Sequence, residues 1–139
     1  MAKYFTIKEM CASNTAKALK IDNTPSKVVE EHLYELMDVL DDIREGWGSV
    51  IRVISGFRCP ILNAAVKGSR TSVHQIGYAA DLYPVNGDFE GFRLFMLEWA
   101  KTHLFDQLLI ERSAYSRWIH IGLRNNAGGQ RRQIKNLKV

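Results

Sequence analysis

The chain has 139 residues, of which 46% are hydrophobic and 24% are charged, and this composition excludes a disordered or fibrous protein. A chain of this length can bury a core of its own, so we expect one domain over residues 1–139. The formal net charge of +4 is modest, but the positive charges are unevenly distributed along the chain.

The start of the chain, Met1 to Thr6, contains no apolar run of the kind found in signal peptides, and no stretch approaches the length of a membrane span. We therefore expect synthesis in the cytoplasm, no membrane partner, and export, where it occurs, by another route. Cys11 and Cys59 form no close-spaced metal motif, and we expect both to be reduced and partly buried.

Residues 1–49 are expected to form N-terminal helices. Thr6 followed by Glu9 fits a capping box, which predicts a short helix ending near Ser13, with another helical turn over 14–20. Pro25 fits the first position of a long helix that ends at residues 46–48. One face of this helix carries apolar residues at steps of three and four: Val29, Leu33, Leu36, Leu40 and Ile43.

Residues 50–123 mix strands and helices without regular alternation. Strands are predicted over 50–55, 78–83, 107–111 and 117–123, with a hairpin joining the last two. Helices are predicted over 60–66 and from an N-cap at Asp88 to about His103. The pattern indicates an α+β fold, in which a small and mostly antiparallel sheet has helices packed on it.

Residues 124–139 form a basic segment without any acidic residue, which we treat as a tail. Its positive charges are Arg124, Arg131, Arg132, Lys135 and Lys138. Such a segment favours a polyanion, for example an anionic cell-wall polymer, and it is equally consistent with a solvated terminus. Nucleic acid is not expected as a partner, because no interleaved aromatic residues or known motif accompany the charges.

A candidate metal site lies in the stretch from Ser72 to Asp81, where His74 and Asp81 bracket Gly77. Gly77 allows a tight turn between a ligand on a loop and a ligand on a strand. His120 lies far downstream on another predicted strand. Two imidazoles and one carboxylate are the ligand types of a catalytic zinc site, whose fourth position stays open for water.

Three motifs in this order resemble the zinc D-alanyl-D-alanine peptidase family. They are Ser55-Gly-Phe-Arg58, then Ser72-x-His74-x-x-Gly77-x-Ala-x-Asp81, then Trp118-Ile-His120. The family includes carboxypeptidases, vancomycin-resistance dipeptidases and phage endolysins, and its fold is similar to that of the hedgehog signalling domain. The N-terminal helices look like those of small phage-encoded members. The resemblance implies one zinc ion per chain at His74, Asp81 and His120, and substrate contact by Arg58 and Ser72.

The general base is where the chain departs from the family pattern. Dipeptidase members carry a glutamate three residues before the last histidine, where this chain has Arg117. The best substitute is Glu111 on the preceding strand. Pairing Glu111 with Trp118 places Leu109 opposite His120 and turns Glu111 toward the zinc face, whereas a register shifted by one residue turns it away.

Other site residues follow from the same register and the same resemblance. Gln107 shares the zinc face and is a candidate for substrate contact, and Asp106 is a weaker candidate for the base. Arg58 is a candidate for stabilising the oxyanion, with an ordinary surface ion pair as the competing interpretation. A cap or turn role competes with substrate contact for Ser72. We expect His32 to face solvent.

Two functions compete. The first is a zinc peptidase that cleaves peptidoglycan stem peptides, either as an L-alanyl-D-glutamate endopeptidase or as a D-alanyl-D-alanine carboxypeptidase. This enzyme is expected to be a monomer that reaches the cell wall by a phage or host-lysis route. The second is a non-catalytic module that keeps zinc and binds cell wall or protein, which the displaced glutamate motivates.

Overall fold

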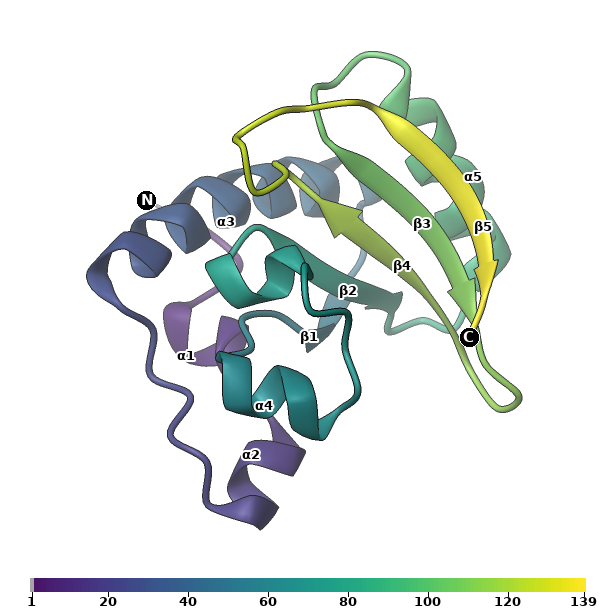
Figure 1. Cartoon of the computed structure of the whole chain (residues 1–139). Coiled ribbons are helices and arrows are strands. Elements are labelled where there is room, and N and C mark those ends of the chain that lie inside the picture. The colour runs from purple at the N-terminus through teal and green to yellow at the C-terminus, as the bar shows by residue number, and fades with distance from the viewer. Residues whose placement is uncertain (1) are drawn as a thin grey trace.

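The fold is that of a computed structural model, which describes residues 2–139 (Figure 1). It confirms the α+β class, with one five-stranded sheet in the order β1-β2-β4-β3-β5. The elements in chain order are α1 (Ile7–Met10), α2 (Asn14–Leu19), α3 (Lys27–Trp47), β1 (Ile51–Ser55), α4 (Pro60–Ala65), the 3₁₀ helix η1 (Val73–Ile76), β2 (Ala79–Pro84), α5 (Phe89–Ala100), β3 (Gln107–Arg112), β4 (Arg117–Gly122) and β5 (Gln133–Lys138). The sheet is mostly antiparallel, and only β3 and β5 pair in parallel.

Side-chain caps set the starts of the first helices. The hydroxyl of Thr6 accepts from the backbone N–H of Glu9 at 3.1 Å, as the capping pattern predicts. The helix α1 nevertheless ends at Met10 and not near Ser13, because the side chain of Ser13 caps α2. The expected start of α3 at Pro25 is also wrong, since Ser26 is the N-cap and the helix begins at Lys27.

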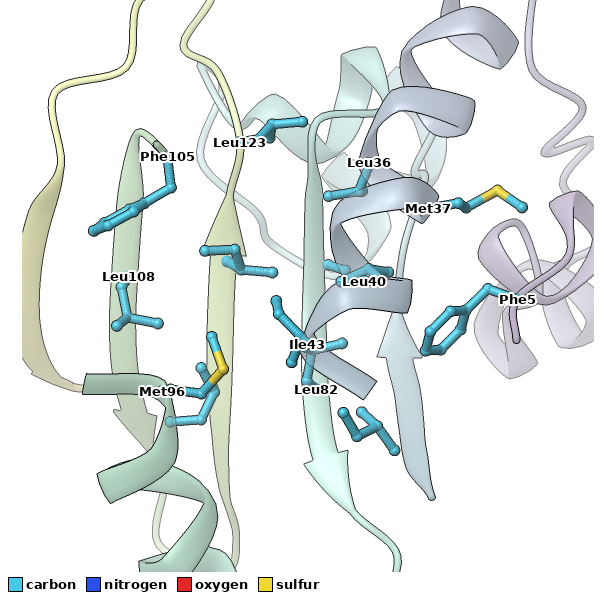
Figure 2. Packing of buried hydrophobic residues seen from close by; sticks show 14 of the residues in the cluster. Phe5, Leu36, Met37, Leu40, Ile43, Leu82, Met96, Phe105, Leu108 and Leu123 are labelled. Carbon is cyan, nitrogen blue, oxygen red and sulfur yellow. The ribbon is translucent and has the colours of Figure 1, made fainter. Parts of the chain in front are cut away.

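The core lies between α3, α5 and one face of the sheet (Figure 2). The predicted apolar face of α3 is buried at Leu33, Leu36, Leu40 and Ile43. Leu82 of β2, Leu108 of β3 and Met96 of α5 belong to the same buried cluster, in which Leu82 lies on the side of α3 and Leu108 on the side of Met96 (Figure 2). Because side chains alternate along a strand, the neighbouring residues of β2, β3 and β4 point to the opposite face of the sheet. That second face carries the candidate site.

The C-terminal residues are not a free tail, which corrects the expectation for residues 124–139. Gln133–Lys138 form β5 along the edge of β3. The strand starts where the N–H of Gln133 donates to the carbonyl of Asp106 at 2.9 Å, after Arg132 has donated to Phe105 at 3.0 Å. Only two of its six residues are apolar and most of them are exposed, so its sequence resembles that of a loop.

Three smaller expectations are settled by local contacts. The helix α5 is capped by Asp88 as predicted but ends at Ala100, short of His103. His32 does not face solvent, because its ring stacks on Tyr78 at 4.1 Å between centroids. Cys11 and Cys59 are both free thiols, and burial raises the pKa of Cys11 to about 11. Within residues 2–139, no helix combines the length and the apolar character that a membrane crossing requires.

Candidate metal centre

Three elements bring the predicted ligands together on the second face of the sheet. The helix η1 carries His74, and the antiparallel pairing of β2 with β4 places Asp81 directly opposite His120. One ligand atom from each residue lies within 4.8 Å of the others. This spacing allows all three atoms to contact a single ion.

The carboxylate of Asp81 lies at the centre of the cluster. Its Oδ1 is 3.0 Å from Nδ1 of His120 and 3.5 Å from Nε2 of His74. The two imidazole rings meet edge to face with 5.1 Å between centroids. His74 is 2% exposed and His120 is 8% exposed, so both imidazole rings are shielded from bulk water.

The backbone of Gly56 orients His74. Nδ1 of His74 lies 2.7 Å from the carbonyl of Gly56, so this nitrogen donates and leaves the lone pair of Nε2 facing Asp81. Gly56 has little room of its own, because a Cβ there would lie 2.2 Å from the carbonyl oxygen of Met10. The close approach of Gly56 to α1 therefore fixes the position of the Gly56 carbonyl, and this carbonyl in turn orients the imidazole of His74.

The protonation states of the cluster suit a metal. Burial lowers the pKa of His74, which favours the neutral ring that a metal needs. Burial alone would raise the pKa of Asp81, but His74 and His120 outweigh it and hold the carboxylate ionised. Two imidazole nitrogens and one carboxylate oxygen are donors of the kind that zinc binds, so the residues fit the expected ion.

Glu111 takes the position that the predicted register gives it. It pairs with Trp118, and Leu109 pairs with His120, which confirms that Glu111 shares the face of the ligands. Its Oε1 is 3.9 Å from Nδ1 of His120, and burial raises the pKa of its carboxyl group. Arg117, at the position of the family's glutamate, lies on the other face with its guanidinium 4.5 Å from the ring centroid of Phe89.

Arg58 enters the site from the loop after β1. Its Nη2 donates to the hydroxyl of Ser72 at 3.4 Å, and its buried Nε has no hydrogen-bond partner. Among residues 2–139 no carboxylate lies within ion-pair distance of its guanidinium, so the competing interpretation of a surface ion pair is not found. Burial lowers the pKa of this arginine, and the carboxylates of Asp81 and Glu111 oppose that shift.

Ser72 caps η1, since its hydroxyl accepts from the backbone N–H of His74 at 3.2 Å. The cap leaves the hydroxyl hydrogen available, so substrate contact stays a prediction beside it. Sequence reasoning missed Asn23, whose side chain donates to the carbonyls of Cys11 and Phe57 and accepts from the N–H of Cys59. Asn23 thereby holds the backbone on both sides of Arg58.

The ligands lie in a cleft of about 780 Å³ that is also lined by Arg58, Ser72, Gln107 and Glu111. Gln107 donates to the side-chain oxygen of Gln133 on β5 at 3.0 Å. Asp106 is unsuited to be the spare base, because both of its carboxylate oxygens accept from the guanidinium of Arg131 at 2.8 and 2.9 Å. Sequence reasoning also missed that Arg131 and Val139, which flank β5, line this cleft.

The His-Asp-His cluster with a carboxylate beside it has the ligand types of a catalytic zinc site. A comparison with protein-family models matches residues 3–122 to the family described as Peptidase M15. The chain belongs to this family of zinc-dependent metallopeptidases. A search of curated proteins gave no match.

Proposed function

We propose that this peptidase hydrolyses the stem peptides of peptidoglycan, with Glu111 as the general base. The observation that carries the proposal is the carboxylate of Glu111, which lies 3.9 Å from Nδ1 of His120 and lines the same cleft as the three ligands. The bond is either L-alanyl-D-glutamate, cut by an endopeptidase, or terminal D-alanyl-D-alanine, cut by a carboxypeptidase. Both occur in the substrate class that the family resemblance implies.

The chain's own residues divide the work of the reaction. His74, Asp81 and His120 would hold a zinc ion, which would supply a Lewis acid and would lower the pKa of a bound water molecule. Glu111 accepts the proton that the attacking water loses and passes it to the leaving amine. Burial raises the pKa of its carboxyl group above the ordinary value, which makes the carboxylate a better acceptor for the proton of the attacking water.

Arg58 and the polar rim of the cleft act on the substrate. Arg58 lines the cleft, and its guanidinium donates to the oxyanion that develops on the scissile carbonyl. Ser72 and Gln107 line the cleft and hydrogen-bond the substrate backbone. We further propose that the protein acts as a monomer on the cell wall, which it reaches by a phage or host-lysis route.

Digestion of purified sacculi tests the proposal. The zinc-loaded protein is expected to release peptide fragments whose masses identify the bond, a chelator to stop the release, and added zinc to restore it. A protein that retains zinc and releases nothing is the non-catalytic module, and that result would overturn the proposal.

Glu111→Gln is expected to lower kcat by about 10²- to 10⁴-fold, because it removes the proton acceptor and leaves all three ligands in place. Zinc content measured on the purified variant should equal that of the unmodified protein. Glu98→Gln is the matched control, since Glu98 is exposed on α5 and forms an ion pair with Lys101, which caps the end of that helix. Full turnover by the Glu111 variant would exclude this residue as the base.

A further inference from the structure

The strand β5 extends the second face of the sheet beyond the metal centre. It pairs in register with β3, so that Gln133 lies beside Gln107, Lys135 beside Leu109, and Leu137 beside Glu111. Paired residues of neighbouring strands point to the same face. The hydrogen bond between the side chains of Gln107 and Gln133 shows this shared direction. The family match ends at residue 122, so β5 lies outside the residues that it covers.

Lys135 stands in the same row as the metal ligands. Reading across the sheet, Asp81 of β2 pairs with His120 of β4, His120 pairs with Leu109 of β3, and Leu109 pairs with Lys135. Neighbouring strands lie about 4.8 Å apart, which puts the Cα of Lys135 about 10 Å from that of His120. That separation corresponds to about three residues of an extended peptide.

The cleft reaches the strand beside β5, because Leu109, the partner of Lys135, lines it. Arg131, which precedes β5, and Val139, which follows it, both line the cleft that holds the metal ligands. Lys135 lies between them on the same face and is exposed. A substrate that runs from the metal ligands across Leu109 therefore passes the ammonium group of Lys135.

The charges on this face leave Lys135 without an internal partner. Arg131 is bound to the carboxylate of Asp106, whereas the carboxylates of Asp81 and Glu111 belong to the metal centre. Lys135 makes no ion pair with any acidic side chain of residues 2–139. Its neighbours Leu109, Gln133 and Leu137 carry no charge. A lone ammonium on a substrate-binding face suits a carboxylate on the substrate.

We propose that Lys135 determines specificity by binding a free carboxylate of the substrate, two strands away from the metal ligands. This inference rests on the proposed function, because that function identifies the substrate as a stem peptide. When the scissile bond joins the two terminal D-alanines, the carboxylate about three residues away is the α-carboxylate of γ-linked D-glutamate, which a carboxamide replaces in amidated peptides. In the endopeptidase reaction the same carboxylate would lie beside the scissile bond, so the inference applies to the carboxypeptidase reaction. The contact favours the acid over the amide and leaves the proton transfers at Glu111 unchanged.

The test compares two synthetic pentapeptides, L-Ala-γ-D-Glu-L-Lys-D-Ala-D-Ala and the same peptide with the glutamate α-carboxylate as carboxamide. The zinc-loaded protein is expected to show a higher kcat/KM for the acid by about three- to fivefold, the range of an exposed ion pair. Lys135→Met should abolish this preference, and Lys135→Glu should reverse it. The preference should also weaken as salt is added.

Lys138→Met is the matched control, because it removes one lysine from the same strand. Lys138 pairs with Arg112 and therefore points to the opposite face. Its variant should keep the preference for the acid. Equal kcat/KM for acid and amide in the unmodified protein would overturn the role of Lys135 while the proposed function stands.

Binding separates the inference from the proposed function. Dissociation constants of both peptides, measured by calorimetry on the zinc-loaded Glu111→Gln variant with and without Lys135→Met, need no turnover. The inference is supported when the acid binds more tightly than the amide and Lys135→Met removes this difference. That support holds even if the unmodified protein cleaves neither peptide. Absence of cleavage would overturn the proposed function alone. Equal binding of acid and amide, or no binding of either, overturns the inference.

Discussion

At the scale of single residues, the side chains that hold the site matter as much as those that face it. Arg58 has no helix or strand to fix it, and its position depends on the loop after β1. Asn23 makes three hydrogen bonds to that loop and its surroundings, at 3.0 Å to the carbonyl of Cys11, 2.9 Å to that of Phe57, and 2.8 Å from the N–H of Cys59. The N–H of Arg58 itself donates to the carbonyl of His74 at 3.0 Å.

Asn23→Ala is expected to lower the free energy of unfolding by about 2–3 kcal/mol, since it leaves three backbone groups without their partner. It should also lower kcat through the loosened Arg58 while zinc content stays unchanged. Denaturant unfolding, peptidase assays and metal analysis measure these three quantities. Asn136→Ala, an exposed asparagine on β5, is the control. Full peptidase activity in the Asn23→Ala variant would refute the role of Asn23 in positioning Arg58.

At the scale of elements, strand pairing was more predictable than the ends of the chain. The hairpin of β3 and β4 followed from alternating apolar residues, and its register followed from requiring that Glu111 face His120. The strand β5 was missed because Gln133–Lys138 contain only two apolar residues and β5 borders the sheet on one side only. Its stability comes from backbone bonds to β3, which leave no periodic signal in the sequence.

The turn between η1 and β2 sets the spacing of His74 and Asp81, and Gly77 occupies its tightest point. Gly77 has a φ of +83°, and a Cβ there would lie 2.9 Å from the carbonyl oxygen of Val29 and 3.0 Å from its Cγ1. The sequence predicted the tight turn. The contact of Gly77 with α3 could not be predicted, because it joins residues far apart in the chain. A side chain here strains the turn and also separates it from α3.

Gly77→Ala is expected to destabilise the fold by about 2–4 kcal/mol, which combines the cost of a positive φ with that of overpacking against α3. Gly87→Ala isolates the first cost, because Gly87 has a φ of +80° and nothing within 4 Å of the added Cβ. Denaturant unfolding of both variants should show the larger loss at Gly77. Equal losses would mean that the contact with α3 contributes nothing.

At the scale of the whole molecule, one buried charge joins the C-terminal segment to the sheet. Asp106 is 2% exposed, and its carboxylate accepts from the guanidinium and the backbone N–H of Arg131. The sequence placed Arg131 in a basic tail, because the charge pattern alone gave no reason to connect it with an aspartate 25 positions earlier. The pairing explains why one positive charge of that segment is not available to an external polyanion.

The same pairing predicts how stability depends on pH. Hydrogen bonds from Arg131 hold the pKa of Asp106 below its ordinary value, against the opposing effect of burial. A carboxyl group whose pKa is lower in the folded than in the unfolded state stabilises the fold above its unfolded pKa, about 3.9, and loses that contribution as the pH falls through the folded value. The stabilisation is therefore complete at neutral pH and absent in strong acid.

Arg131→Met is expected to cost about 2 kcal/mol at pH 7, because it leaves the buried carboxylate of Asp106 with only one hydrogen bond from the backbone. The difference from the unmodified protein should shrink as the pH falls below about 4, where protonation of Asp106 removes the unpaired charge. Denaturant unfolding of the metal-free proteins between pH 7 and pH 3 measures this difference in the free energy of unfolding. Arg52→Met is the control, since Arg52 is exposed and makes no ion pair within residues 2–139. A difference that stays constant from pH 7 to 3 would show that Arg131 stabilises the fold through its aliphatic contacts and not through its charge.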